Sequence, residues 1–184
     1  MATTRRQLES PTRRQPKGGA KLDGARGLDQ WTTIYQAYNS VFKVAELALL
    51  SQHLSLPQLH LLGVLKKGGG LLTTGEIGQA MVKASQTITG LVDRLEEPGL
   101  VERVFDRRDR RKTWVRLTEK GDRKLAEAFP VATRLAEELS SVLTDEELQE
   151  LQDKLEKLRS AAMDRLTTAL ARQQVRVFAG LQEL

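Results

Sequence analysis

The sequence predicts a mainly α-helical protein with one small β-hairpin. Apolar residues recur at spacings of three and four along most of the chain after residue 28, which is the period of an amphipathic helix. Two short runs rich in Val, Trp and Thr, residues 100–105 and 113–118, follow one another and predict a pair of strands. At 184 residues, the chain has room for a single sizeable core.

Residues 1–27 are predicted to form a flexible basic arm. They contain several Pro and Gly residues, no aromatic residue and few aliphatic ones, so they cannot bury enough surface to offset the cost of ordering. A solvated tail without a specific partner is an equally open interpretation. Residues 28–184 are predicted to form one domain, which begins with a long amphipathic helix over residues 28–52.

Two capping boxes predict where the next two helices begin. Ser55 with Gln58 predicts a helix that ends just before the glycines at 68–70, which we expect to form a loop. Thr73 with Glu76 predicts a second, short helix that ends near residue 82.

A third helix is predicted over residues 85–97, with one apolar and one polar face. Ile88, Leu91, Val92 and Leu95 share the apolar face, and Pro98-Gly99 ends the helix. The open side and the N-terminal end carry Lys83, Ser85, Gln86, Thr87 and Thr89.

The strands 100–105 and 113–118 flank a strongly basic loop, and two further helices follow. Five of the six residues from Arg107 to Lys112 are basic. Thr118 predicts the start of a helix to about residue 139, with a bend near Pro130. Thr144 with Glu147 predicts a last helix. Leucines and an alanine form a seam along it, at positions 148, 151, 155, 158, 162, 166 and 170.

This order of elements is the pattern of a winged helix-turn-helix. The second helix of such a pair lies in the major groove of DNA, where a Gln such as Gln86 can pair bidentately with adenine. Arginine-rich loops are suited to a narrow minor groove. The alternative for both features is a polar face and a charged turn that only contact solvent.

Four stretches resemble the MarR family of bacterial and archaeal transcriptional regulators. They are residues 56–62 (LPQLHLL), 91–101 (LVDRLEEPGLV), 106–111 (DRRDRR), which is the most specific, and 115–121 (VRLTEKG). The resemblance implies a winged helix-turn-helix core over residues 55–121, with dimerisation helices at 28–54 and 122–184. Gly90 and Pro98 depart from the family pattern, since many relatives have a basic residue at each of these positions.

The pattern and the resemblance together predict a DNA-binding residue set. It comprises Lys83, Ser85, Gln86, Thr87, Thr89 and Arg94 near the helix, and Arg107, Arg108, Arg110 and Arg111 in the wing. By the resemblance, Asp109 braces a wing arginine, with Arg111 preferred, and Arg110 or Arg111 enters the minor groove. The resemblance also implies a small, often aromatic, anionic effector. Trp31, Tyr38 and His60 are candidates to line its pocket, although core packing is the preferred interpretation of each.

Composition excludes several classes of function. The absence of Cys removes disulfides, thiolate catalysis and Cys-ligated zinc. His53 and His60, seven residues apart without acidic neighbours at ligand spacing, do not predict a metal site. We find no nucleophile elbow, nucleotide loop or paired carboxylates, so neither an enzyme nor a cofactor is predicted. The chain has no apolar run that could span a membrane and no secretory signal, which predicts a soluble, cytoplasmic protein.

The net charge of +5 is unevenly distributed, with a basic middle and an acidic C-terminal third. This polarised charge suggests an oriented anionic partner. With the helix-turn-helix pattern, the family resemblance implies a homodimeric, ligand-responsive repressor that binds a pseudo-palindromic site in double-stranded DNA. The alternative is a winged-helix interaction module whose basic wing binds an acidic protein partner.

Overall fold

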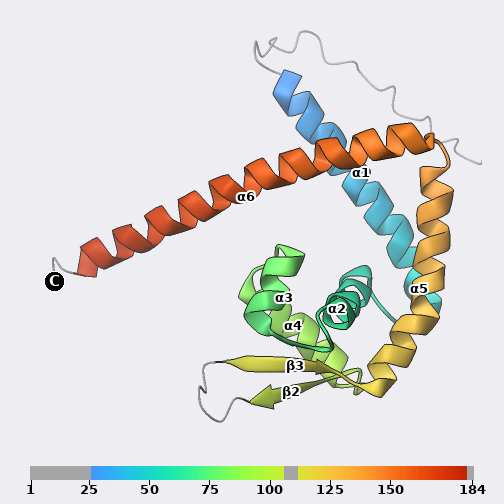
Figure 1. Cartoon of the computed structure of the whole chain (residues 1–184), viewed down its shortest axis with the longest axis horizontal. Helices are drawn as coiled ribbons and strands as arrows, with labels where there is room; N and C mark the ends of the chain where they lie inside the picture. Colours follow the sequence, from blue (N-terminus) through green and yellow to red (C-terminus); the bar gives the residue numbers. More distant parts are fainter. Residues whose placement is uncertain (1–25, 106–111, 182–184) are drawn as a thin grey trace, which may run out of the picture. The chain divides into compact units, whose positions relative to one another are not determined.

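The computed structural model describes the backbone of residues 26–105 and 112–181, and the side chains of residues 27–104 and 112–170. The predicted arm, residues 1–27, therefore lies almost entirely outside the described residues. The chain divides into two compact units, Met1–Lys43 and Val44–Leu184, which are described separately. The first unit contains most of helix α1 (Arg26–Leu49), and the second contains all the later elements (Figure 1).

Helices α2 (Leu56–Lys67) and α3 (Thr74–Met81) begin at the two predicted capping boxes. The Ser55 amide donates to Gln58 Oε1 at 2.8 Å, and the Thr73 amide donates to Glu76 Oε2 at 2.7 Å. In each box the side chain of the N-cap residue accepts a hydrogen bond from the backbone three residues on. Because the boxes satisfy amides that have no partner within the helix, they fix where each helix starts.

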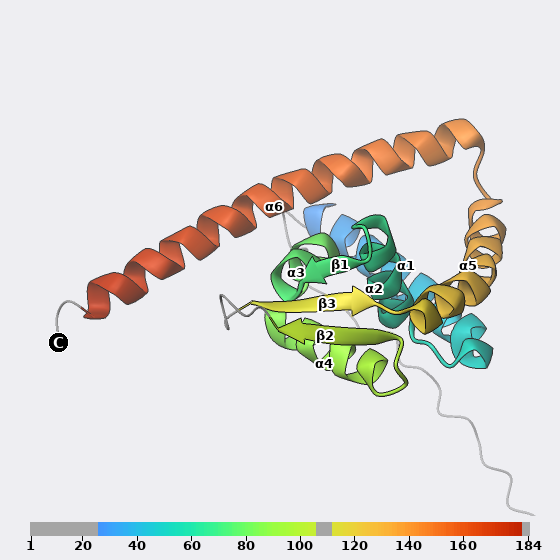
Figure 2. The same cartoon turned by 60° about the horizontal axis from the view of Figure 1, so that its bottom comes forward.

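Strands β1 (Leu71–Thr73), β2 (Val101–Phe105) and β3 (Thr113–Leu117) form an antiparallel sheet in the order β1-β3-β2. Figure 2 shows the three strands side by side, with β3 in the middle. Strands β2 and β3 confirm the predicted hairpin. The sequence analysis missed β1, which follows the turn at Gly68–Gly70 and pairs Leu71 with Arg116. Three residues are too few to show an alternating pattern, so only the pairing with β3 reveals this strand.

Helix α4 (Ser85–Glu96) completes the helix-turn-helix and packs with α2 and α3 on one face of the sheet (Figure 1). Its four predicted apolar residues are all buried, as are Leu61, Leu62 and Leu65 of α2 and Ile77 of α3. Val101 and Val115 close the core from the sheet. Burial of each large aliphatic side chain is worth about 1.5–3 kcal/mol, so this cluster accounts for much of the stability of the second unit.

Helices α5 (Glu119–Ser140) and α6 (Asp145–Leu181) follow the sheet. Thr118 caps α5 as predicted, since its Oγ1 accepts a hydrogen bond from the Gly121 amide at 3.0 Å. Gly121 also lies so close to strand β2 that a Cβ at this position would overlap the carbonyl oxygen of Leu100. The helix runs on through Pro130. The third predicted capping box is present too, with the Thr144 amide donating to Glu147 at 2.9 Å.

Candidate DNA-binding surface

The turn between α3 and α4 is held tightly by the backbone. The Lys83 amide donates to the Gly78 carbonyl at 2.9 Å, and Val82 adopts a left-handed conformation with a φ of 52°. A Cβ on Gly78 would lie 3.1 Å from the Lys83 carbonyl oxygen, so a side chain here would require the turn to shift by a few tenths of an ångström. The glycine at 78 therefore allows the close approach of α3 to the turn that leads into α4.

Helix α4 buries one face and exposes the other. Ile88, Leu91, Val92 and Leu95 face the core. The predicted DNA-binding residues of this region are all exposed: Lys83, Ser85, Gln86, Thr87, Thr89 and Arg94. The Thr89 hydroxyl donates to the Ser85 carbonyl at 3.1 Å, so its oxygen can act towards DNA only as an acceptor.

The N-terminus of α4 is open. Among the described residues, no side chain caps it, and its first turn contains no acidic residue. The positive end of the helix dipole therefore lies in the same turn as Gln86 and Thr87. Such an end attracts phosphate.

The β2–β3 hairpin packs beside α4. Residues 106–111, which include Arg107, Arg108, Asp109, Arg110 and Arg111, lie outside the described residues. The predicted brace by Asp109 and the predicted minor-groove arginines therefore stay predictions. Below the tip, Arg116 on β3 pairs with Glu102 on β2 at 2.8 Å, and both side chains are exposed.

An arginine that the sequence analysis did not single out joins the hairpin to α4. Arg103 of β2 donates from Nη2 to Asp93 Oδ1 at 2.6 Å and forms an ion pair with Glu96 through Nη1. Its backbone amide also donates to Glu96 Oε1 at 2.9 Å. Burial acts to lower the pKa of the Arg103 guanidinium, but its hydrogen bonds and charge interactions with Asp93 and Glu96 outweigh burial and raise that pKa above its usual value. The spacing of Asp93 and Glu96 places both carboxylates on one helix turn, but only the packing of β2 against α4 brings Arg103 to them.

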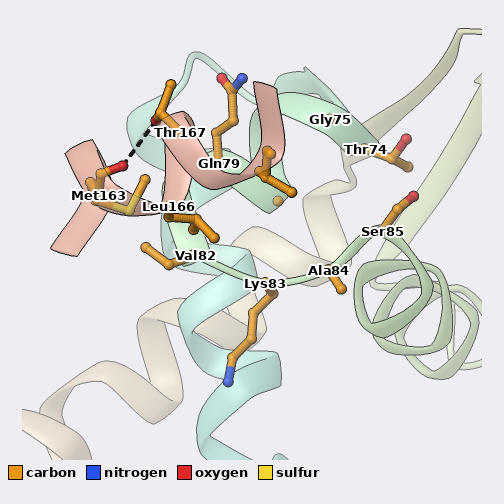
Figure 3. Close-up of a pocket in the computed structure, with 12 residues that line it drawn as sticks. Thr74, Gly75, Gln79, Val82, Lys83, Ala84, Ser85, Met163, Leu166 and Thr167 are labelled. Atoms are coloured by element: carbon orange, nitrogen blue, oxygen red, sulfur yellow. Dashed lines mark hydrogen bonds between the residues drawn. The ribbon is translucent and has the colours of Figure 1, made fainter. Parts of the chain in front are cut away.

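A cavity of about 740 Å³ lies within the second unit, between the α3–α4 turn and α6. Gln79, Val82 and Lys83 line it on one side, and Met163 and Leu166 line it on the other (Figure 3). The amine of Lys83 extends away from the α6 residues, whereas the apolar side chains lie between the two elements. The lining is therefore mainly apolar, with a few polar groups at the turn.

The aromatic and histidine candidates do not pack as expected. Trp31 and Tyr38 are 60% and 55% exposed, and His60 is also exposed, so the predicted core role of these three residues is wrong. Trp31 and Tyr38 are exposed side chains of α1, and His60 is an exposed side chain of α2. None of the three lines the cavity. The described residues contain no group of three metal-ligating side chains.

Comparison with known proteins agrees with this geometry. The sequence profile of the MarR family matches residues 54–112. The transcriptional repressor MdtR of Bacillus subtilis is 34% identical over 105 residues, which cover 57% of this chain and 67% of MdtR. The chain spans 62%, 51% and 67% of the length of three curated relatives, the Bacillus subtilis regulators YsmB, MhqR and MdtR.

Solved structures show the same fold. The organohalide-sensing regulator RdhR-CbdbA1625, bound to 2,4-dichlorophenol, has a TM-score of 0.71 and 24% identity, with coverage of 83% of this chain and 89% of the regulator. A mutant MarR of E. coli in complex with operator DNA has a TM-score of 0.67 and 21% identity, with coverage of 76% and 99%.

The fold and the open face of α4 define a winged helix-turn-helix protein. The matched relatives include transcriptional regulators. The chain belongs to the MarR family. Within the described part of the chain, no helix is long and apolar enough to cross a membrane.

Proposed function

We propose that this chain is a cytoplasmic transcriptional repressor that binds double-stranded DNA in a sequence-specific manner. The observation that carries the proposal is the exposed polar face of α4, with its uncapped N-terminus, beside a hairpin whose loop sequence is basic. A major groove admits an α-helix, and side chains near the N-terminus of the second helix reach the base edges.

Each residue of the set has a role that its chemistry supports. Gln86 reads a base through its amide, and the hydroxyls of Ser85, Thr87 and Thr89 supply shorter contacts. Lys83 and Arg94 bind phosphates at the edges of the groove. In the wing, Arg107, Arg108, Arg110 and Arg111 follow the minor groove, with Asp109 bracing one of them.

The proposed regulator acts as a homodimer. The leucines of the α6 seam are between 43% and 52% exposed at positions 151, 155, 158, 166 and 170, which leaves an apolar face that a second copy of the chain would bury. Two copies place their α4 helices in successive major grooves, about 34–36 Å apart, and so match a pseudo-palindromic site.

The cavity beside the α3–α4 turn is the proposed effector site. Its apolar lining suits a small aromatic ligand, and RdhR-CbdbA1625 is a relative in fold that was solved with a chlorinated phenol. Because Val82 and Lys83 belong both to the lining and to the turn before α4, a ligand that prefers one position of the turn shifts the population that binds DNA.

Selection of duplexes from a random pool by the purified protein tests the DNA-binding function. We expect a pseudo-palindromic duplex to be enriched, and its affinity to fall steeply with salt. Gln86→Ala should cost about 1–3 kcal/mol on that duplex and relax the choice at one base pair in each half-site. Gln149→Ala, at an exposed position of α6, is the matched control and should leave the selected site unchanged.

Two results would contradict the proposal. A protein that enriches no sequence, or that binds all duplexes alike, does not read DNA through α4. If it then binds acidic proteins through residues 107–112, it is an interaction module instead.

A further inference from the structure

Arg103 fastens the wing to helix α4 at several points. It lies on β2, an edge strand of the sheet, opposite the fully buried Val115 of β3, so its side chain points towards α4. The guanidinium reaches Asp93 and Glu96 and also lies 3.4 Å from the carbonyl oxygen of Thr89. These acceptors lie within residues 89–96, a stretch of eight residues of α4 that extends about 10 Å along the helix axis.

Glu96 contacts both the backbone and the side chain of Arg103. One carboxylate oxygen accepts the backbone amide of Arg103, and the other pairs with its guanidinium. The amide belongs to an edge strand, where an N–H would otherwise have no partner. The contact therefore fixes both the strand backbone and the side chain to the same turn of α4.

The second ion pair of the hairpin shows what Arg103 adds. The Arg116–Glu102 pair joins β3 to β2 with both side chains 50% exposed, and it does not reach α4. The Arg103 side chain is only 17% exposed, and its contacts lie between the sheet and the helix. A shielded, multiply bonded guanidinium restrains its partners more than an exposed pair of the same charge does.

The contacts of Arg103 with α4 lie on both sides of a glycine inside the helix. Gly90 lies in the middle of the helix, and a Cβ at this position would have no neighbour within 4 Å. A glycine inside a helix costs about 0.5–1 kcal/mol relative to alanine, because it loses more backbone freedom on folding. Arg103 contacts Thr89 on one side of Gly90 and Asp93 on the other.

We propose that Arg103 is a positioning residue for DNA reading, which locks α4 to the hairpin so that the base-reading residues and the wing meet the duplex in register. Arg103 does not contact DNA in this proposal. Its charge is used inside the protein, and its effect reaches the duplex through Thr89 and the neighbouring turn of α4. The inference rests on the proposed function, because it assigns a role in reading the same surface.

The test compares Arg103→Gln with the matched control Arg116→Gln, which removes an arginine from the same hairpin. The probes are the duplex that the wild-type protein selects from a random pool and the same duplex with one base pair changed in each half-site. For Arg103→Gln we expect the ratio of the two affinities to fall about tenfold, because misplaced side chains lose their base contacts. The salt slope should stay as in the wild type, since no phosphate contact is removed. Arg116→Gln should keep the ratio.

Hydrogen exchange provides a second test of the inference, which does not require DNA. In Arg103→Gln, the amides of residues 89–96 should exchange about tenfold faster than in the wild type, while those of α2 stay unchanged. Arg103→Lys should be intermediate, because an ammonium can pair with one carboxylate but cannot span the helix as a guanidinium does. Adding Gly90→Ala to Arg103→Gln should restore part of the protection.

Several outcomes would overturn the inference. A salt slope reduced by about 0.9 with the affinity ratio intact would make Arg103 a phosphate contact. A lower melting temperature with wild-type ratio and exchange, measured where the variant is folded, would reduce Arg103 to a merely stabilising residue. If the wild-type protein selects no duplex, the proposed function fails and the reading role of Arg103 fails with it. If it does select one, a wild-type ratio in Arg103→Gln overturns this inference alone.

Discussion

Helices α4 and α6 carry the same kind of apolar pattern but use it differently. In α4, the side chains at spacings of three and four are at most 6% exposed, because α2, α3 and the sheet cover them. In α6, five leucines of the seam are 43–52% exposed. Helical periodicity therefore indicates which face is apolar but not what covers it. The covering surface of α4 lies within the chain, and that of the α6 seam is proposed to lie on a second copy.

The largest expected effect is the loss of stability when a buried side chain of α4 is shortened. Leu95→Ala should lower the free energy of unfolding by about 2–5 kcal/mol, because it removes a fully buried side chain and leaves a cavity. The neighbouring Arg94→Ala is exposed and should change that free energy by no more than about 0.5 kcal/mol. Urea unfolding at one protein concentration measures both. Equal effects would show that the packing of α4 does not depend on its buried face.

Changes to the exposed leucine seam of α6 should affect the oligomeric state of the protein. Replacing Leu155 and Leu158 together with Lys should abolish the dimer, because each burial is worth about 1.5–3 kcal/mol. Light scattering should then return a particle of 20.6 kDa, whereas the wild type should be twice as large. The control replaces Gln149 and Gln152 with Lys on the same helix and should keep the dimer. A wild-type protein of 20.6 kDa at micromolar concentration would contradict the proposed role of the seam.

The helices and the hairpin could be predicted because their signals are local. The capping boxes at Ser55, Thr73 and Thr144 each lie within four residues, and the structure confirms all three. Strand β1 could not be predicted, since it exists through pairing with β3, more than forty residues later. The Arg103 cluster depends in the same way on the packing of β2 against α4.

The parts of the candidate site that depend on local sequence could likewise be predicted, whereas those that depend on distant segments could not. The exposed polar face of α4 followed from periodicity alone, since burying Ile88 and Leu95 leaves Gln86 and Thr87 outside. The expected core role of Trp31 and Tyr38 was wrong because periodicity assigns a face but not its cover. The cavity joins α3 to residues 163–170, and no sequence pattern links such distant segments.

A smaller effect should come from the intrinsic stability of α4. Gly90→Ala should raise the free energy of unfolding by about 0.5–1 kcal/mol, since the position is helical and a Cβ there meets no atom within 4 Å. Chemical unfolding of the variant and the wild type at one concentration measures the gain. A loss of stability would indicate that the helix needs the flexibility of Gly90 in order to pack.

The smallest effect should come from the exposed ion pairs of α6. The hydrogen bond from Lys154, together with its charge, lowers the pKa of Glu150, so this pair stabilises the fold above the carboxyl's ordinary pKa. The stabilisation is lost as the pH falls through the lowered value. Glu150→Gln should therefore melt slightly below the wild type at neutral pH and together with it in acid. In molar salt, where the screening length is about 3 Å, the difference in melting temperature between Glu150→Gln and the wild type should shrink. The difference in melting temperature between Arg103→Gln and the wild type should persist, because the guanidinium of Arg103 is shielded from solvent. Thermal unfolding by circular dichroism at two pH values and two salt concentrations measures both. A difference for Glu150→Gln that survives salt and acid would mean that the residue acts through packing rather than charge.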